Sequence, residues 1–365
     1  MHTVNTGVST VIGLKSWKPE DIIVHEEIGS PNKAVYFFAS FDLCNFTSIK
    51  TISTSWILII ATIYELLKSD KPFEMNFWKF LGDELLFYRK VHSIREIVEL
   101  SKFADEFRDY MEYALNERVH LNEYSDILRV KAGVWISNVM ELKHLHVNNL
   151  DNIVSNDISQ SYMYLDEQTK RYDFVGVNID EGFRMCSLAS QNVLVVDPKI
   201  AYIVYNCKDI NSSNQASAKT IDYISNFTSK LKVIARCDLK GVWGDLFFPF
   251  VLYSINPGML SEYKIPDGVS AEKNGDGSLP TYTLDMLGSI FAESQKAITN
   301  LYDIKELLAM EANKGDIIAP IYDKGWIEEA LMNLVKSQCA EGMSLEQIAE
   351  AAKIKVSELQ ELLNL

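Results

Sequence analysis

The sequence predicts an α+β fold, because short runs of β-branched and aromatic residues alternate with longer segments that carry apolar residues at helical spacing. The chain has 365 residues, 47% of them apolar and 23% charged, a balance typical of globular proteins with a sizeable core. A Gly- and Pro-rich run at 255–280 interrupts these patterns. We therefore expect a mixed domain over 1–254, a linker over 255–280 and a helical C-terminal module, without strands, over 281–365.

The predicted elements follow one another along the mixed domain. Strands are expected at 34–41, 73–80, 84–90, 127–136, 193–196, 231–238 and 246–253. Helices are expected at 47–67, 96–118 and 180–189, and a short one begins at Asp197-Pro198. The polar segment 137–172 predicts a long connection that contributes contacts between protomers.

Composition narrows the class of function. The formal net charge of −15 disfavours non-specific binding to nucleic acid, which requires a basic surface. The five cysteines are scattered, as in reduced cytosolic proteins, and the N-terminus lacks a basic start followed by an apolar run. The most apolar stretch, 56–67, is shorter than the roughly 20 residues that cross a membrane. We expect a cytoplasmic protein without a membrane span or a nucleic-acid partner.

Two acidic residues stand where strands are expected to end or turn. Asp42 follows the first predicted strand, and Asp83 belongs to the turn Leu81-Gly82-Asp83 between the next two. Carboxylate oxygens are the ligands that Mg²⁺ prefers, and two metal ions activate a hydroxyl and neutralise a leaving pyrophosphate. The alternative is structural: Asp42 caps the following helix and Asp83 only makes the hairpin turn.

Two cations and one acid–base pair complete the candidate residues. The planar fork of Arg184 suits the charge on a phosphorus under attack, and Lys240 stands in a Lys-Gly step at a strand end. Lys79 and Asp173 supply a donor and an acceptor for the edge of a base, each three residues before a glycine. Taken singly, Arg184 and Lys240 are more often surface charges, and Lys79 with Asp173 could be a solvent-facing ion pair.

In this order the motifs resemble the catalytic domain of class III nucleotide cyclases over roughly residues 32–254. The first metal motif is similar to Phe38-Ala-Ser-Phe-Asp-Leu-Cys-Asn-Phe-Thr47, the second to Lys79-Phe-Leu-Gly-Asp83, and the second base-reading motif to Asp173-Phe-Val-Gly176. The resemblance implies a ferredoxin-like βαββαβ core, two Mg²⁺ or Mn²⁺ ions per site, and a head-to-tail homodimer with two sites at its interface.

The same resemblance implies a role for each candidate residue. Asp180 falls where the family usually has an Asn that orients the ribose. The other roles are metal binding for Asp42 and Asp83, base reading for Lys79 and Asp173, stabilisation of the transition state for Arg184 and phosphate binding for Lys240.

A narrower resemblance concerns the substrate. The segment Ile179-Asp-Glu-Gly-Phe-Arg184, together with Ser40-Phe-Asp-Leu43 and Gly82-Asp-Glu84, is similar to the Pycsar-type cyclases of bacterial antiphage defence. Those enzymes turn CTP or UTP into cyclic CMP or cyclic UMP, which would alert a separate effector protein.

A pyrimidine is smaller than a purine, so its pocket needs more bulk, for which Trp78, Phe77 and Phe46 are the candidates. The pair Lys79 and Asp173 is also expected of an ATP-specific family member. An adenylyl cyclase that makes cyclic AMP therefore stays open, as does an inactive nucleotide sensor.

Two further patterns have weaker functional meaning. His144-Leu-His146 has the spacing of metal ligands but no third ligand nearby, which favours a polar loop or strand edge. The tail from Gly342 resembles a helix-turn-helix with Ser344 and Ser357 as N-caps. Between residues 326 and 365, seven Glu stand against three Lys, which favours a protein-interaction or regulatory module over DNA binding. A transcriptional regulator with this tail as its main functional unit is the third reading.

Overall fold

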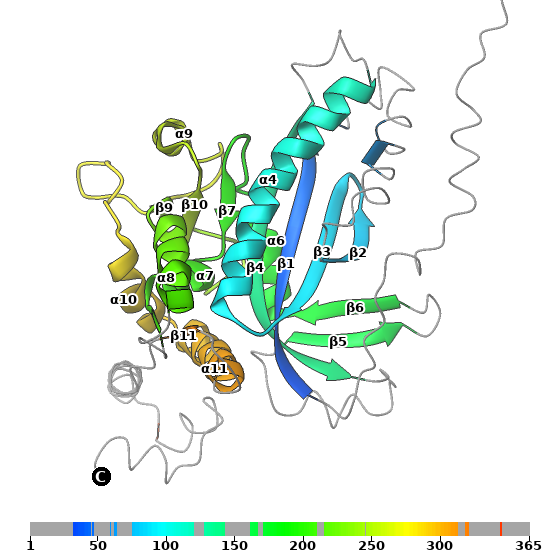
Figure 1. Ribbon diagram of the computed structural model, residues 1–365. Coiled ribbons are helices and arrows are strands. Elements are labelled where there is room, and N and C mark those ends of the chain that lie inside the picture. Colours follow the sequence, from blue (N-terminus) through cyan, green and yellow to red (C-terminus); the bar gives the residue numbers. More distant parts are fainter. Residues whose placement is uncertain are drawn as a thin grey trace, which may run out of the picture.

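The computed structural model describes residues 32–44, 46, 59, 62–63, 75–119, 128–142, 161–166, 171–209, 215–244, 246–312, 318–320 and 344. Within these residues, nine strands form one mixed sheet and helices pack on both of its faces (Figure 1). The predicted α+β fold is confirmed. None of the described helices is long and apolar enough to cross a membrane.

The part of the sheet that carries the candidate residues has the strand order β2-β3-β1-β4. Its elements are β1 (Asn32–Cys44), β2 (Asn76–Leu81), β3 (Glu84–Val91), α4 (Ile94–Val119) and β4 (Arg129–Leu142). β1 lies between β3 and β4 and is antiparallel to both, which is the strand order of a ferredoxin-like unit. The helix predicted over 47–67 falls mostly outside the described residues, but Ile59, Thr62 and Ile63 are helical and buried.

The sheet continues beyond β4 in two directions. One arm runs through β7 (Leu194–Val196) and β10 (Phe248–Tyr253) to β9 (Leu231–Cys237), and β7 is parallel to β4. A second arm, β5 (Ser161–Asp166) and β6 (Arg171–Gly176), pairs with the far end of β4. The intervening helices are α6 (Val177–Cys186), α7 (Pro198–Tyr205) and α8 (Gln215–Thr228). The start of α7 is confirmed, because the Asp197 side chain accepts a hydrogen bond from Lys199 N.

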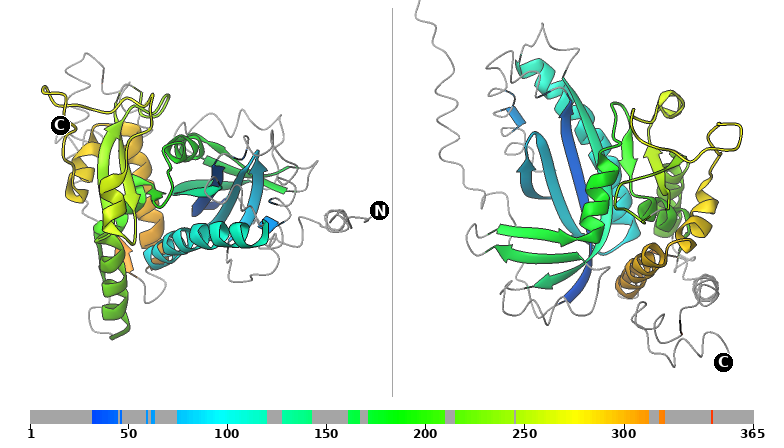
Figure 2. Two further views of the ribbon diagram at one scale, coloured as in Figure 1. Left: turned by 90° about the horizontal axis from the view of Figure 1, so that it is seen from above. Right: turned by 180° about the vertical axis from the view of Figure 1, so that it is seen from behind.

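Alternation along β1 separates two aromatic layers. The ring of Phe41 contacts Phe107 of α4 at a centroid distance of 5.2 Å. The ring of Phe38 stacks on Trp135 at 5.3 Å, and Trp135 in turn meets Phe183 of α6 at 5.6 Å. α4 and α6 therefore cover opposite faces of these strands, as Figure 2 shows from above. Because side chains alternate with a period of two, Asp42 shares the α6 face with Phe38.

The segment 137–172, predicted as a long polar loop, contains strands. β4 continues to Leu142, β5 lies within this segment, and β6 begins at Arg171. The polar residues of β4 misled the sequence analysis because they are buried and hydrogen-bonded. Glu141, for example, is 5% exposed and accepts hydrogen bonds from Tyr36 Oη and Lys90 Nζ, both at 2.7 Å.

The C-terminal part is helical where it is described, with one exception. The run at 255–280 contains α9 (Pro257–Glu262), and η4 (Leu284–Met286), α10 (Leu287–Ala292) and α11 (Gln295–Ala312) follow. The absence of strands beyond 281 was wrongly predicted, because β11 (Ile318–Pro320) pairs with β8 (Cys207–Asp209) in a small second sheet. α11 packs against β1 and β4.

Other predictions concern residues that lie outside the described part of the chain. His144-Leu-His146 and the helix-turn-helix tail, apart from Ser344, lie outside the described residues. The division into domain, linker and C-terminal module stays a prediction.

Candidate active site

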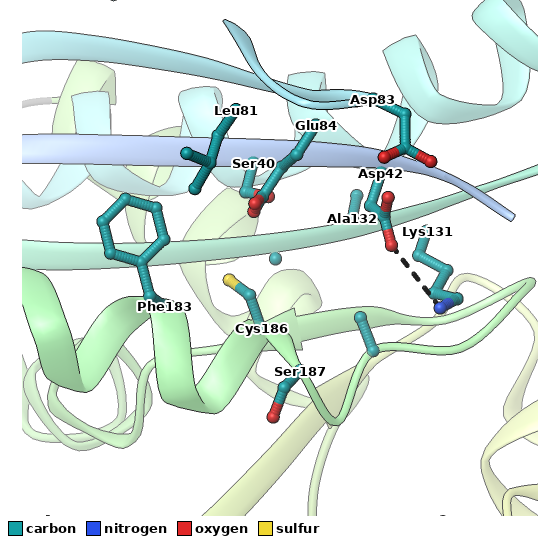
Figure 3. A pocket seen from close by; sticks show the side chains of 12 residues that line it. Ser40, Asp42, Leu81, Asp83, Glu84, Lys131, Ala132, Phe183, Cys186 and Ser187 are labelled. Carbon is teal, nitrogen blue, oxygen red and sulfur yellow. Dashed lines mark hydrogen bonds and ion pairs between the residues drawn. The ribbon is translucent and has the colours of Figure 1, made fainter. Parts of the chain in front are cut away.

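A pocket opens where the end of β1, the β2–β3 turn, the start of β4 and the end of α6 meet. It brings together Asp42 and Asp83 with polar side chains for which the sequence predicted no role of their own, among them Ser40, Glu84 and Lys131. Figure 3 shows the two aspartates and Lys131 at one end, and Leu81 and Phe183 at the other. We call this the carboxylate pocket.

Local backbone structure places the two aspartates. Gly82 has a φ of +71°, a conformation that side chains disfavour, so it permits the tight β2–β3 turn that presents Asp83. Asp42 lies opposite Glu84 of β3 on one side and Lys131 of β4 on the other. The register of three strands therefore gathers these charges at one point.

The electrostatics of the carboxylate pocket are unbalanced. Lys131 Nζ lies 3.5 Å from Asp42 Oδ2, and Glu84 accepts a hydrogen bond from Ser40 Oγ. Burial raises the pKa of Glu84, and repulsion from Asp42 and Asp83 adds to the rise, although the hydrogen bond from Ser40 opposes it. Three carboxylates thus share one lysine within this pocket.

This donor set fits a divalent cation that is shared with a substrate. Mg²⁺ is usually held by one or two carboxylates plus substrate phosphates and water, not by a closed protein cage. Among the described residues, no group of three or more His, Cys, Asp or Glu is arranged to hold a metal ion by itself. Asp42 and Asp83 are the residues that would hold Mg²⁺ or Mn²⁺.

A second cluster forms around Asp173. Its Oδ1 accepts hydrogen bonds from Lys79 Nζ at 2.7 Å and from Trp78 Nε1 at 2.8 Å. Its Oδ2 accepts one from Tyr164 Oη at 3.4 Å. The side chains of Lys79 and Asp173 are 37% and 32% exposed, so solvent or a ligand can reach this pair. We call these four residues the Asp173 cluster.

A β-bulge explains how two consecutive residues reach one carboxylate. Neighbouring strand residues normally point to opposite faces, but the register of β2 on β3 shifts between Phe77 and Lys79. Trp78 and Lys79 therefore both bind Asp173, and the Lys79 ammonium also lies 4.6 Å from the centre of the Trp78 ring.

The three aromatic residues expected to fill a pyrimidine pocket are in the core. Phe46, Phe77 and Trp78 are only 1%, 3% and 3% exposed, and none of them lines the carboxylate pocket. The ring of Trp78 is enclosed by Phe38, Phe174 and Phe183. In this arrangement the ring of Trp78 packs in the core while its indole N–H donates to Asp173.

α6 presents Asp180 and Arg184 on its exposed side. The two residues are one turn apart, with the acid in the first turn and the base in the last, as the helix dipole favours. The buried side of α6 approaches the sheet very closely, because a Cβ on Gly182 would lie 2.4 Å from Trp135 ring atoms. Only glycine fits at this position.

A buried cluster of ion pairs contacts the same helix on its buried side. Glu181 accepts a hydrogen bond from Lys199 Nζ, which also lies 3.4 Å from Asp197 Oδ2, and all three residues are buried. Burial alone would lower the pKa of Lys199, but the two carboxylates outweigh it and hold that pKa above its ordinary value.

The structure thus brings the predicted residues together in part. Asp42 and Asp83 meet in the carboxylate pocket, and Lys79 meets Asp173. Asp180 and Arg184 do not line that pocket, and neither does Lys240, which is exposed in the turn after β9.

Two of the residues that were missed carried a signal in the sequence. Ser40 stands two positions before Asp42, on the same face of one strand, and Glu84 directly follows Asp83. No comparable local signal marks Lys131 or Tyr164, because the pairing of β1 with β4 and of β5 with β6 places them.

Comparisons with known proteins concern the fold. The adenylyl cyclase CyaB from P. aeruginosa matches with 9% sequence identity and a TM-score of 0.42, over 62% of this chain and 97% of that one. The catalytic core of a rhodopsin-guanylyl cyclase with converted specificity, in complex with ATPalphaS, matches with 13% identity and a TM-score of 0.39, over 63% and 100%. The guanylate cyclase domain of RhGC from Catenaria anguillulae, in complex with GTP, matches with 11% identity and a TM-score of 0.37, over 61% and 98%. No protein-family model and no curated protein sequence matches the chain.

Proposed function

We propose that this protein is a nucleotidyl cyclase, a phosphorus–oxygen lyase that converts CTP or UTP into the 3′,5′-cyclic monophosphate and pyrophosphate. The observation that carries the proposal is the pairing of two clusters on one hairpin. Asp83 in the β2–β3 turn joins Asp42 in a pocket with excess negative charge, and Lys79, four residues earlier, is paired with Asp173 within reach of solvent.

The reaction is an intramolecular displacement. The ribose 3′-oxygen forms a bond to the α-phosphorus, the bond from that phosphorus to the bridging oxygen breaks, and pyrophosphate leaves with the electron pair. The hydroxyl proton must leave as the new bond forms. Asp42 and Asp83 would hold two Mg²⁺ or Mn²⁺ ions per site, which when bound favour loss of that proton and neutralise the departing pyrophosphate.

The remaining residues orient the substrate. Lys79 donates to the base edge and Asp173 accepts from it, so a base with the wrong pattern leaves buried polar groups unpaired. Asp180 binds the ribose hydroxyls from the exposed side of α6. Arg184 stabilises the charge that spreads over the phosphorus in the transition state, and Lys240 binds the terminal phosphate.

A second copy of the chain completes the site. The carboxylate pocket of one chain has a volume of about 260 Å³, below the roughly 300–1,000 Å³ of ligand pockets. Two apolar side chains beside the clusters are exposed, Leu81 at 53% and Val175 at 51%. In the head-to-tail homodimer that we propose, one protomer supplies Asp42 and Asp83 and its partner supplies the base- and phosphate-binding residues.

Two features favour a pyrimidine. The segment Ile179–Arg184 resembles that of the Pycsar-type cyclases, which make cyclic CMP or cyclic UMP. In addition, the Tyr164 hydroxyl donates to Asp173 Oδ2 at 3.4 Å and adds an aromatic side chain beside the base-reading pair. In this proposal the product is a cytoplasmic second messenger of antiphage defence, and a separate effector protein binds it.

The second candidate is an adenylyl cyclase. The specific observation in its favour is the intact ion pair between Lys79 and Asp173, which suits the donor and acceptor pattern of adenine.

The experiment is incubation of the purified protein with ATP, GTP, CTP and UTP separately, with Mn²⁺, followed by identification of products by mass. Cyclic CMP or cyclic UMP, absent when Asp42→Asn and Asp83→Asn are combined, supports the proposal. Cyclic AMP selects the second candidate. Tight nucleotide binding without any product would contradict both and indicate a nucleotide sensor.

A further inference from the structure

A buried polar network connects the C-terminal helix α11 to the catalytic helix α6. Asn138 of β4 stands at its centre. Asn138 Oδ1 accepts hydrogen bonds from Asn178 Nδ2 of α6 at 3.0 Å and from Asn300 Nδ2 of α11 at 3.2 Å. Asn138 Nδ2 donates to Asp303 Oδ2 of α11 at 3.1 Å. Three elements far apart in the sequence are thus joined through one side chain.

The burial of this network makes it specific. Asn138, Asn178 and Asn300 are only 0%, 3% and 2% exposed. A buried amide that loses its partner keeps the full cost of desolvation, so the arrangement of β4, α6 and α11 that makes these three hydrogen bonds is favoured. The network therefore fixes the position of α6 relative to α11 more sharply than apolar contacts alone.

Asn178 lies between two of the proposed substrate-binding residues in the chain. It belongs to the first turn of α6, five residues after Asp173 and two before Asp180. The N-cap of this helix is Gly176, and no side chain caps it. The first turn of α6 is therefore held by its tertiary contact with Asn138 instead of a local cap.

Charged contacts add to this connection. Lys33 Nζ of β1 donates to Asp303 Oδ2 at 2.5 Å, so the same carboxylate ties α11 to both β1 and β4. Lys296, in the first turn of α11, interacts electrostatically with the carboxylates of α6. Burial lowers the pKa of Lys296, while Glu181 and Asp180 oppose that change and Lys199 adds to it.

We propose that α11 is part of the catalytic apparatus: Asn300 and Asp303 are positioning residues that act through Asn138 and Asn178 to hold the first turn of α6. The C-terminal region then controls turnover, because a displacement of α11 moves the helix that carries Asp180 and Arg184. The inference rests on the proposed cyclase function only for the activity measurement, and its structural part stands independently.

The test uses the full chain with Asn300→Asp, which keeps the shape of the side chain, removes the N–H donor to Asn138 and adds a carboxylate one turn from Asp303. We expect kcat to fall about tenfold while KM for the preferred triphosphate changes less than about twofold, since the lost interaction orients α6 and not the base. We also expect amide hydrogen exchange in residues 177–186 to become about tenfold faster, with α4 unchanged. The matched control is Glu306→Gln, a change to an exposed residue of the same helix.

Three results would overturn the inference. In the first, Asn300→Asp keeps the wild-type kcat and the wild-type rate of hydrogen exchange in α6. In the second, exchange accelerates equally in α4 and α6. In the third, Glu306→Gln shows the same effects as Asn300→Asp. If Asn300→Asp does not fold, Asn300→Leu supplies the same comparison with an apolar side chain of similar size. If the wild-type protein makes no cyclic nucleotide, the proposed function fails, but exchange in 177–186 still decides whether α11 holds α6.

Discussion

The carboxylate pocket and the Asp173 cluster share the β2–β3 hairpin, but their charges are satisfied in opposite ways. Asp173 is one carboxylate with three side-chain donors, from Lys79, Trp78 and Tyr164, within 3.4 Å. Asp42, Asp83 and Glu84 are three carboxylates that share their pocket with one cation of the described residues, Lys131, which lies 3.5 Å from Asp42. The Asp173 carboxylate is thus matched by donors of the protein itself, whereas the carboxylate pocket has the charge to fit a metal ion.

The largest expected effect is the loss of cyclase activity when a carboxylate is removed from the carboxylate pocket. Asp42→Asn should lower cyclase activity by roughly a hundredfold or more, because it removes a ligand of the proposed metal site. The melting temperature should not fall, since the change also relieves repulsion from Glu84. Activity assays and thermal unfolding measure the two quantities, with Glu106→Gln on the exposed side of α4 as the control. A large loss of stability would mean that Asp42 is structural.

The next effect concerns the Asp173 cluster. Trp78→Phe keeps an aromatic ring in the core but removes the N–H that binds Asp173 Oδ1 at 2.8 Å. We expect kcat/KM for the preferred triphosphate to fall about tenfold and discrimination between bases to weaken. Tyr164→Phe should act in the same direction but less, because its contact is longer, 3.4 Å. An equal loss with all four triphosphates would argue against a role in base reading.

Variants of the two clusters should differ in how much a bound metal ion stabilises the protein. Mn²⁺ at about a hundred times its dissociation constant should stabilise the wild-type protein by about 2.7 kcal/mol, because it binds the folded state only. Asp42→Asn should abolish this gain, and Lys79→Met should retain it. Thermal unfolding with Mn²⁺ or with EDTA measures both variants, and equal shifts in the two would contradict a metal site at Asp42.

The smallest effect is the pH dependence that Glu84 contributes. Its pKa is raised by burial, so the folded state holds the proton more tightly than the unfolded chain does. Ionisation therefore costs stability as the pH rises from the ordinary carboxyl pKa through the folded one. Glu84→Gln should remove this dependence and stabilise the metal-free protein at neutral pH by about 0.2–1 kcal/mol, the effect of like charges opposite each other on paired strands. Urea unfolding across this pH range would show it, and a wild-type profile in the variant would disprove it.

The sequence by itself determined the local features of this protein. A run of aromatic and β-branched residues predicted β1, which extends past Asp42, Gly82 marked the turn that carries Asp83, and Asp197-Pro198 marked the start of α7. Periodicity and turn chemistry depend on neighbours in the chain, and a single sequence displays them directly.

Only the tertiary structure decided which distant residues share a site. Strand register placed Lys131 beside Asp42, and Tyr164 and Trp78 against Asp173. Buried hydrogen bonds turned polar residues such as Asn138 and Glu141, which in a sequence favour a loop, into parts of a long strand that docks α11. Hydrophobic pattern and turn residues specify an element, but the partners of buried polar groups come from segments far away in the chain.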